Sequence, residues 1–355
     1  MLAKSWIPAA FFACIIATCA SHAMNSANSS DLLVTLRREG ASKFADRLES
    51  DPETLSFFLA NAKTIFAPSD LFLELQARGL ASPDEQADAR RQGCHSERHL
   101  KSTAPPGSTI STLEKAKKLD NQEQKVVLDN RPDKTAGKAR RWDSHAAFQR
   151  RISNETVPKP LPNMKLLSGL GKATHIIKAD IKFDQGFVHI TDSYFTRPQS
   201  LSNTSQSTGQ TTFANLAASG NLTATLDNMH SVTVFVPSNN ALSSSSRLCG
   251  SDAAQLVSNH VVSGFVGYLP ELKDGATLKT LTGETLNIKV SEGRYYVNGA
   301  LITLANMIMD NGVAHVIDKP LTHVPLTAGN SRTWATDFIF TALGASGVMV
   351  AFALI

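Results

Sequence analysis

The stretch GVAHVIDKPLTHVP (residues 312–325) decides the fold, because its pattern occurs twice in the chain. Its counterpart is GFVHITDSYFTRP (residues 186–198), and both stretches carry His-x-x-Asp inside an apolar run. A second repeated pair lies upstream, where TIFAPSD (residues 64–70) recurs as TVFVPSN (residues 233–239). Each half of the chain therefore opens with a short apolar strand ending in Pro-Ser and closes with a His-x-x-Asp strand, which indicates an internal duplication.

Each half is predicted to place helices first and strands afterwards. Residues 31–50 and 211–228 have apolar side chains at intervals of three and four, the pattern of amphipathic helices. In the second half, TLKTL, TLNIKV, RYYVN and ALITL are separated by turn residues, which predicts an antiparallel meander. The expected fold class is α+β.

The first copy is longer than the second. Phe66 and Gly186 are 120 residues apart, whereas Phe235 and Gly312 are 77 residues apart. The extra residues are expected within about 82–160, where charged residues are mixed with Pro and Gly, and this insertion is predicted to be solvated loop and weak helix. A basic ligand-binding face is the alternative interpretation of the same segment.

These motifs resemble the two signatures of the fasciclin domain, an adhesion module. The second copy resembles the family over residues 211–324, where TVFVPSNNAL, LVSNHVVSG, LKTLTGETLNI, VNGALI and NGVAHVID follow in family order. The first copy, residues 31–198, matches well only at its ends and is interpreted as a divergent domain of the fungal kind, joined to the second by residues 199–210. The resemblance implies tandem fasciclin domains, each a wedge of β-strands packed with a helical layer.

The His-x-x-Asp pairs, His189 with Asp192 and His315 with Asp318, are interpreted as structural. Residues three apart in a strand point to opposite faces, so neither pair is expected to share a metal ion or a proton. The histidine is expected to face inward and bond to the backbone, while Asp318 caps the following turn.

No catalytic residue, cofactor or metal site is predicted, and the protein is not expected to be an enzyme. Ser69 and Ser238 each follow a proline, but no Gly-x-Ser-x-Gly elbow surrounds them, so they are expected to cap helices. The sequence shows neither a glycine-rich phosphate loop nor paired Cys/His zinc spacing.

In adhesive members of the family an Asp-Ile pair just before the closing strand is a proposed integrin contact, and the resemblance carries over the fold and the surface role but not this receptor. In the first copy Asp180 and Ile181 stand at this place, whereas the second copy has Asn306 and Met307. The resemblance therefore makes Asp180 and Ile181 candidate adhesion contacts. A turn acid and a core residue are the structural alternative for this pair.

Both ends of the chain predict processing. Residues 1–23 combine a lysine, an apolar run and small residues suited to signal peptidase, which predicts a secretory signal. Residues 338–355 are 18 uncharged residues behind a polar spacer at 325–337, which predicts a glycosylphosphatidylinositol anchor at Gly329 or Asn330. A retained transmembrane helix is the alternative for this tail.

Four sequons predict N-glycans, at Asn28, Asn154, Asn203 and Asn221. After signal removal the chain keeps two cysteines, Cys94 and Cys249, which could form one bridge or remain two thiols.

A formal net charge of +4 does not indicate a nucleic-acid partner. The expected function is that of a secreted or surface-anchored glycoprotein that binds protein or glycan ligands in adhesion, with self-association left open. The alternative is a vacuolar or endomembrane protein whose lumenal fasciclin domains act in fusion of autophagosomes with the vacuole. The two hypotheses differ in the tail, which is replaced by lipid in the first and retained in the second.

Overall fold

The structure is a computed structural model, and it describes residues 31–79, 89–100, 107–129, 160–161 and 164–321. The described residues belong to one compact unit, Met1–Leu321. The predicted signal peptide, polar spacer and tail lie outside the described residues, as do Asn28, Asn154, Gly329 and Asn330. Within the described ranges no helix is long and apolar enough to cross a bilayer.

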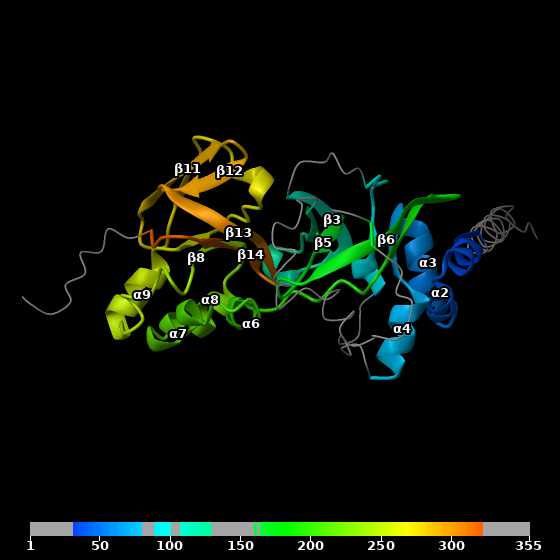
Figure 1. Cartoon of the computed structure of the whole chain (residues 1–355), viewed down its shortest axis with the longest axis horizontal. Helices are drawn as coiled ribbons and strands as arrows, with labels where there is room; N and C mark the ends of the chain where they lie inside the picture. The colour runs from blue at the N-terminus through cyan, green and yellow to red at the C-terminus, as the bar shows by residue number, and fades with distance from the viewer. Residues whose placement is uncertain (1–30, 80–88, 101–106, 130–159, 162–163, 322–355) are drawn as a thin grey trace, which may run out of the picture. The chain divides into compact units, whose positions relative to one another are not determined.

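The first half of the molecule, residues 31–198, is a helical layer followed by a seven-stranded sheet (Figure 1). Residues 31–39 are helical. They are followed by α2 (Ser42–Glu49), α3 (Pro52–Asn61), β1 (Thr64–Pro68), α4 (Asp70–Ala77), η1 (Ala89–Gln92), β2 (Gly93–Cys94), β3 (Ser108–Lys115), η2 (Lys117–Leu119), β4 (Glu123–Asp129), β5 (Lys165–Leu167), β6 (Ala173–Phe183) and β7 (Gly186–Thr191).

The second half, residues 199–321, repeats this arrangement. Its elements are α6 (Leu201–Ser207), α7 (Thr211–Ser219), α8 (Thr223–Asn228), β8 (Val232–Pro237), α9 (Gly250–Ser258), β9 (Val261–Ser263), η3 (Leu269–Glu271), β10 (Thr277–Lys279), β11 (Thr285–Ser291), β12 (Arg294–Val297), β13 (Ala300–Met309) and β14 (Gly312–Ile317). Leu201 of α6 is buried in the core of this half, so the residues predicted to be a linker contain a helix that packs with the second half.

The two sheets have the same strand order. The first runs β2-β1-β7-β6-β5-β4-β3, and the second, read from its far edge, runs β9-β8-β14-β13-β12-β11-β10. The opening and closing strands of each half are parallel neighbours, β1 with β7 and β8 with β14, and the other named pairs are antiparallel. The predicted meander and the α+β class are confirmed.

The expectation of loop and weak helix for the insertion is wrong for residues 108–129, where β3 and β4 extend the first sheet. Ile110, Leu113 and Val126 of these strands are at most 5% exposed, so the hairpin contributes core side chains. Residues 130–164 link β4 to β5, whereas Glu292 and Gly293 alone link the equivalent β11 and β12. The extra length of the first copy therefore falls mainly in this one connection.

Local sequence explains where the helices begin. The Asp51 side chain accepts the Thr54 N–H at 3.1 Å, which caps α3 ahead of Pro52. Ser69 accepts the Phe72 N–H at 3.4 Å and caps α4, as its position after Pro68 predicts. Ser238 accepts the Ala241 N–H at 3.3 Å, so it caps a turn rather than a helix.

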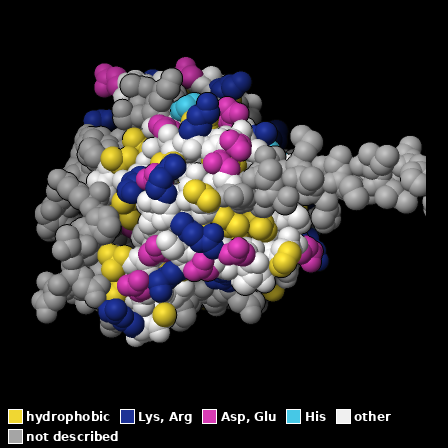
Figure 2. Space-filling view, turned by 90° about the vertical axis from the view of Figure 1, so that its right-hand side faces the viewer, with side chains coloured by type: hydrophobic (Ala, Val, Ile, Leu, Met, Phe, Trp, Pro, Cys, Tyr) yellow, Lys and Arg dark blue, Asp and Glu magenta, His cyan; other side chains and the backbone are white. Residues whose placement is uncertain are grey.

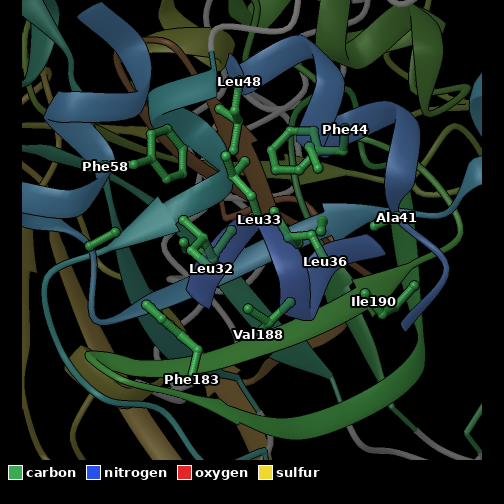
Figure 3. Close-up of a cluster of buried hydrophobic side chains, with 14 of the residues drawn as sticks. Leu32, Leu33, Leu36, Ala41, Phe44, Leu48, Phe58, Phe183, Val188 and Ile190 are labelled. Carbon is green, nitrogen blue, oxygen red and sulfur yellow. The ribbon is translucent and has the colours of Figure 1, made fainter. Parts of the chain in front are cut away.

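One core cluster of the first half lies between its N-terminal helices and the sheet (Figure 3). Leu36 and Phe44 from the helical layer meet Val188 and Ile190 of β7, and all four are at most 1% exposed. Burial of each such side chain contributes about 2 kcal/mol. Because α7 and α9 pack similarly in the second half, each half has its own core.

Candidate functional site

The histidine of the second signature forms hydrogen bonds with backbone groups of two other segments. His315, in β14, is 0% exposed, and its Nε2 lies 2.8 Å from the Gly267 carbonyl oxygen. Its Nδ1 accepts the Asn306 N–H at 3.4 Å. Since Nδ1 accepts a hydrogen bond, Nε2 must carry the proton and donate to Gly267. His315 thus joins the closing strand, β13 and the loop after β9.

His189 makes the same connection in the first half. Its Nε2 lies 2.9 Å from the Arg98 carbonyl oxygen, and its Nδ1 accepts the Asp180 N–H at 3.1 Å. Each imidazole also stacks on the phenylalanine of the opening strand, with ring centroids 5.2 Å apart for Phe66 and 5.7 Å apart for Phe235. The two signatures therefore hold equivalent positions in the two halves.

The residues that donate to these histidines are bulge residues. Asp180 in β6 and Asn306 in β13 have φ values of 57° and 59°, where the register of each strand pair shifts. Aspartate and asparagine tolerate this left-handed conformation better than most residues. Their side-chain oxygens accept the N–H groups of Leu100 and Leu269, each at 3.1 Å. The signal for this connection is an Asp or Asn nine residues before each signature histidine.

Burial sets the protonation of the histidines. Loss of solvent lowers the pKa of His189 and of His315 to about 4, although hydrogen bonds to backbone carbonyls oppose the shift. The same cause lowers the pKa of His260 to about 4, where Nδ1 lies 2.7 Å from the Leu256 carbonyl oxygen and Nε2 accepts the Leu321 N–H. All three rings are therefore neutral at neutral pH.

The signature aspartates bind the neighbouring strand. Asp192 accepts the His175 N–H at 2.8 Å, and Asp318 accepts the Leu301 N–H at 2.8 Å. The expected role of Asp318 as a turn cap is thus corrected, because its carboxylate joins the end of β14 to the start of β13. Histidine and aspartate of each signature bind different groups, and no cluster of potential metal ligands occurs in the described parts of the chain.

Asp180 and Ile181 differ in exposure. The Asp180 side chain is 38% exposed and lies 3.6 Å from Nδ1 of His99, while Ile181 packs against the core of the first half. In the second half, Asn306 and Met307 at these places are at most 2% exposed. Of the two candidate adhesion contacts, Asp180 is therefore the more accessible.

The sequons within the described ranges are accessible. Asn203 lies in α6 and Asn221 follows α7, and both side chains are exposed. Cys94 is buried and Cys249 is exposed, and both are free thiols. Burial raises the pKa of the Cys94 thiol.

The surface of the first half carries mixed charges. Figure 2 shows basic and acidic side chains interspersed on the side where α2 and α3 lie in Figure 1. Several form exposed ion pairs, such as Arg37 with Asp46 at 2.9 Å and Lys43 with Glu74 at 3.7 Å. Such pairs contribute little stability, and the pattern is typical of a solvated face.

Polar contacts connect the β3–β4 hairpin of the first half to the second half. Lys118 donates to an Asp310 carboxylate oxygen at 2.9 Å, and the Gln124 amide donates to the Met309 carbonyl oxygen at 3.1 Å. Val127 of β4 packs with buried Tyr268. This hairpin lies in the predicted insertion, so the contacts could not be anticipated from the family pattern.

Comparison with known proteins finds a matching family model, similar sequences and a similar solved structure. A model of the fasciclin domain family matches residues 208–323. Two similar relatives are fasciclin-like arabinogalactan proteins. CTB11 of Cercospora beticola is 33% identical over a match that covers 47% of this chain and 49% of the relative. A protein of Arthroderma benhamiae is 32% identical over a match that covers 44% of this chain and 38% of the relative. The chain thus spans about half the length of these relatives or less. A solved domain pair from the insect adhesion molecule fasciclin I aligns with a TM-score of 0.36 at 15% identity, covering 80% of this chain and 98% of that one.

Proposed function

Because this chain belongs to the fasciclin family, we propose that it is a secreted or surface-anchored glycoprotein that acts in adhesion, by binding proteins or glycans rather than by catalysis. One observation carries the proposal. In both halves the signature histidine and aspartate are bound to backbone groups, so these repeated polar residues build the fold and recognition is left to exposed surface.

The sequence of the ends supports a surface location. The predicted signal at residues 1–23 would direct secretion, and residues 325–355 would direct lipid attachment at Gly329 or Asn330. Glycans at Asn203 and Asn221 would lie on exposed parts of the second half. The vacuolar alternative requires that residues 338–355 stay in the membrane.

The test is to display the full-length chain, tagged after Ala27, on cells that do not aggregate. Cells displaying an unrelated domain between the same end segments are the control. We expect the tagged cells to aggregate and phospholipase C specific for phosphatidylinositol anchors to disperse them. Retention in the membrane with residues 338–355 intact would reject the anchor and favour the vacuolar alternative. A chain that reaches the surface without causing aggregation or binding to the cell wall would reject the adhesive function.

A further inference from the structure

The segment that follows the signature aspartate is bound differently in the two halves. In the second half this segment is residues 319–321, and the Leu321 N–H donates to Nε2 of His260 at 2.9 Å. Nδ1 of His260 lies 2.7 Å from the Leu256 carbonyl oxygen, so Nδ1 carries the ring proton and donates to this oxygen. His260 therefore binds Leu321 only in its neutral form, because Nε2 must keep a free lone pair.

Gln92 occupies in the first half the position that His260 occupies in the second. Gln92 directly precedes β2 as His260 directly precedes β9, and each of these strands pairs with the opening strand of its half. The residues that they bind are also equivalent, since Phe195 and Leu321 each lie three positions after the signature aspartate. The two halves thus make the same connection with different side chains.

The Gln92 amide makes this connection without a titrating group. Its oxygen accepts the Phe195 N–H at 2.9 Å, and its nitrogen donates to the Phe66 carbonyl oxygen at 3.1 Å. A further bond holds the same segment, because the Thr196 N–H donates to the Ser168 hydroxyl at 3.0 Å. A side-chain amide stays neutral where an imidazole gains a proton. We therefore expect the first-half segment to stay bound in acid.

One hydrogen bond holds the second-half segment. Within the described part of the chain, the bond from Leu321 to His260 is the only hydrogen bond of residues 319–321. The next bound residue upstream is Asp318, whose N–H and carboxylate both bind Leu301. Leu321 also packs its half-buried side chain against the core of the second half.

Protonation of His260 would break this bond. A second ring proton would sit on Nε2, so two donors would face each other at the Leu321 N–H. The new charge would also be buried, because His260 is 0% exposed, and burial already lowers its pKa to about 4. The charged side chains on the elements next to the ring are exposed and make no contribution to this shift: Asp252, Lys279, Asp318 and Lys319.

We infer that His260 is a pH-dependent clamp, whose protonation releases residues 319–321 from the second half while the equivalent segment of the first half stays bound. The three released residues would add about 10 Å of extended chain and expose the Leu321 side chain. They lead to the spacer at 325–337, so acid would let the second half move farther from a membrane. This consequence rests on the proposed lipid anchor, whereas the clamp itself does not.

The test is hydrogen exchange of single amides in the full-length glycosylated chain at pH 7 and pH 4.5, corrected for intrinsic exchange rates. Protection of the Leu321 amide should fall about 50-fold, the ratio given by pKa values of about 4 for the buried ring and 6.5 for the exposed ring. The Phe195 amide, bound to Gln92, should change less than about threefold. The Phe235 amide, which donates to the His260 carbonyl at 2.8 Å, should stay at least about tenfold more protected than Leu321 at pH 4.5.

The matched variant is His260→Gln, which places the amide of the first half in the second. This variant should keep the Leu321 amide protected at pH 7 and reduce the pH effect to less than about threefold. If the variant does not fold, the comparison of Leu321 with Phe195 in the parent chain still decides the question.

Four results would overturn the inference. These are constant protection of Leu321 between the two pH values, an equal loss at Phe195, a pH effect that persists in folded His260→Gln, and loss of protection at Phe235 to the level of Leu321. The last result would mean that acid unfolds the second half as a whole. Release of Leu321 in a chain that carries no lipid anchor would keep the clamp and reject only its consequence at the membrane.

Discussion

The two halves of the molecule have the same strand order but differ in how much of the family sequence they keep. The family model matches the second half, residues 208–323, and the first half shares with it the histidine, the aspartate and the bulge residue. These shared residues all satisfy backbone N–H or carbonyl groups. The comparison teaches that divergence has spared the positions where a lost side chain would leave buried backbone groups unpaired.

The halves differ most in the connection between β4 and β5 and in the buried histidines. Among the described residues, the first half contains one buried histidine with a lowered pKa, His189, and the second half contains two, His260 and His315. The long connection joins β4 to β5, and β6 lies between β5 and the parallel pair of β1 and β7. Such an insertion can be accepted because it leaves the central strand pairing unchanged.

Acid should produce the largest difference between the halves. Each buried histidine has a pKa of about 4 in the folded state and about 6.5 in the unfolded state. Between these two pH values the unfolded chain binds more protons than the folded chain. The free energy of unfolding therefore falls as the pH falls from 6.5 to 4. We expect roughly 3 kcal/mol of lost unfolding free energy per histidine at pH 4, and twice the loss in the second half.

The measurement is hydrogen exchange of each half at pH 7 and pH 4.5, corrected for intrinsic exchange rates. The variant His230→Gln is the control, because His230 is exposed and is not one of the three buried histidines. The first half losing protection before the second would contradict the expectation.

The glycine that opens each closing strand should give the next largest effect. A Cβ on Gly186 would overlap the Lys63 carbonyl oxygen, and a Cβ on Gly312 would overlap the Val232 carbonyl oxygen. Since backbone must move in both cases, Gly186→Ala and Gly312→Ala should each cost about 4 kcal/mol in urea unfolding. Gly293→Asn, in an open turn at φ 70°, should cost under about 1 kcal/mol. Equal stability of the alanine variants and the parent would show that the strand pairs are looser than described.

The sequence predicted the repeated strands, the helical layers and the meander, because each has a clear apolar period. It did not predict β3 and β4, since Thr112 and Gln124 are buried polar residues that interrupt the apolar alternation of these strands. The site was harder to predict. The role of Asp180 depends on a left-handed bulge, which has no counterpart in the apolar pattern of the strand.

Removing the signature histidines should have a smaller effect than the glycine changes. His315→Leu leaves the Asn306 N–H and the Gly267 carbonyl unpaired, and His189→Leu does the same to Asp180 and Arg98. Each variant should lose about 3 kcal/mol of unfolding free energy. His99→Leu, at a half-exposed ring, is the control. A large loss in only one half would show that the two connections are not equivalent.

Exchanging the bulge residues between the two halves should change stability least. Asn306→Asp should destabilise the second half moderately, and Asp180→Asn should have almost no effect on the first. Asn306→Asp places a carboxylate at a site that is 2% exposed and should cost about 2 kcal/mol at pH 7. Asp180→Asn keeps the acceptor for the Leu100 N–H and the left-handed backbone, so it should change stability by less than about 0.5 kcal/mol. This variant removes the candidate adhesive charge alone. If cell aggregation falls while urea unfolding is unchanged, Asp180 is an adhesion contact. If aggregation is also unchanged, its role is limited to the bulge that the second half builds with asparagine.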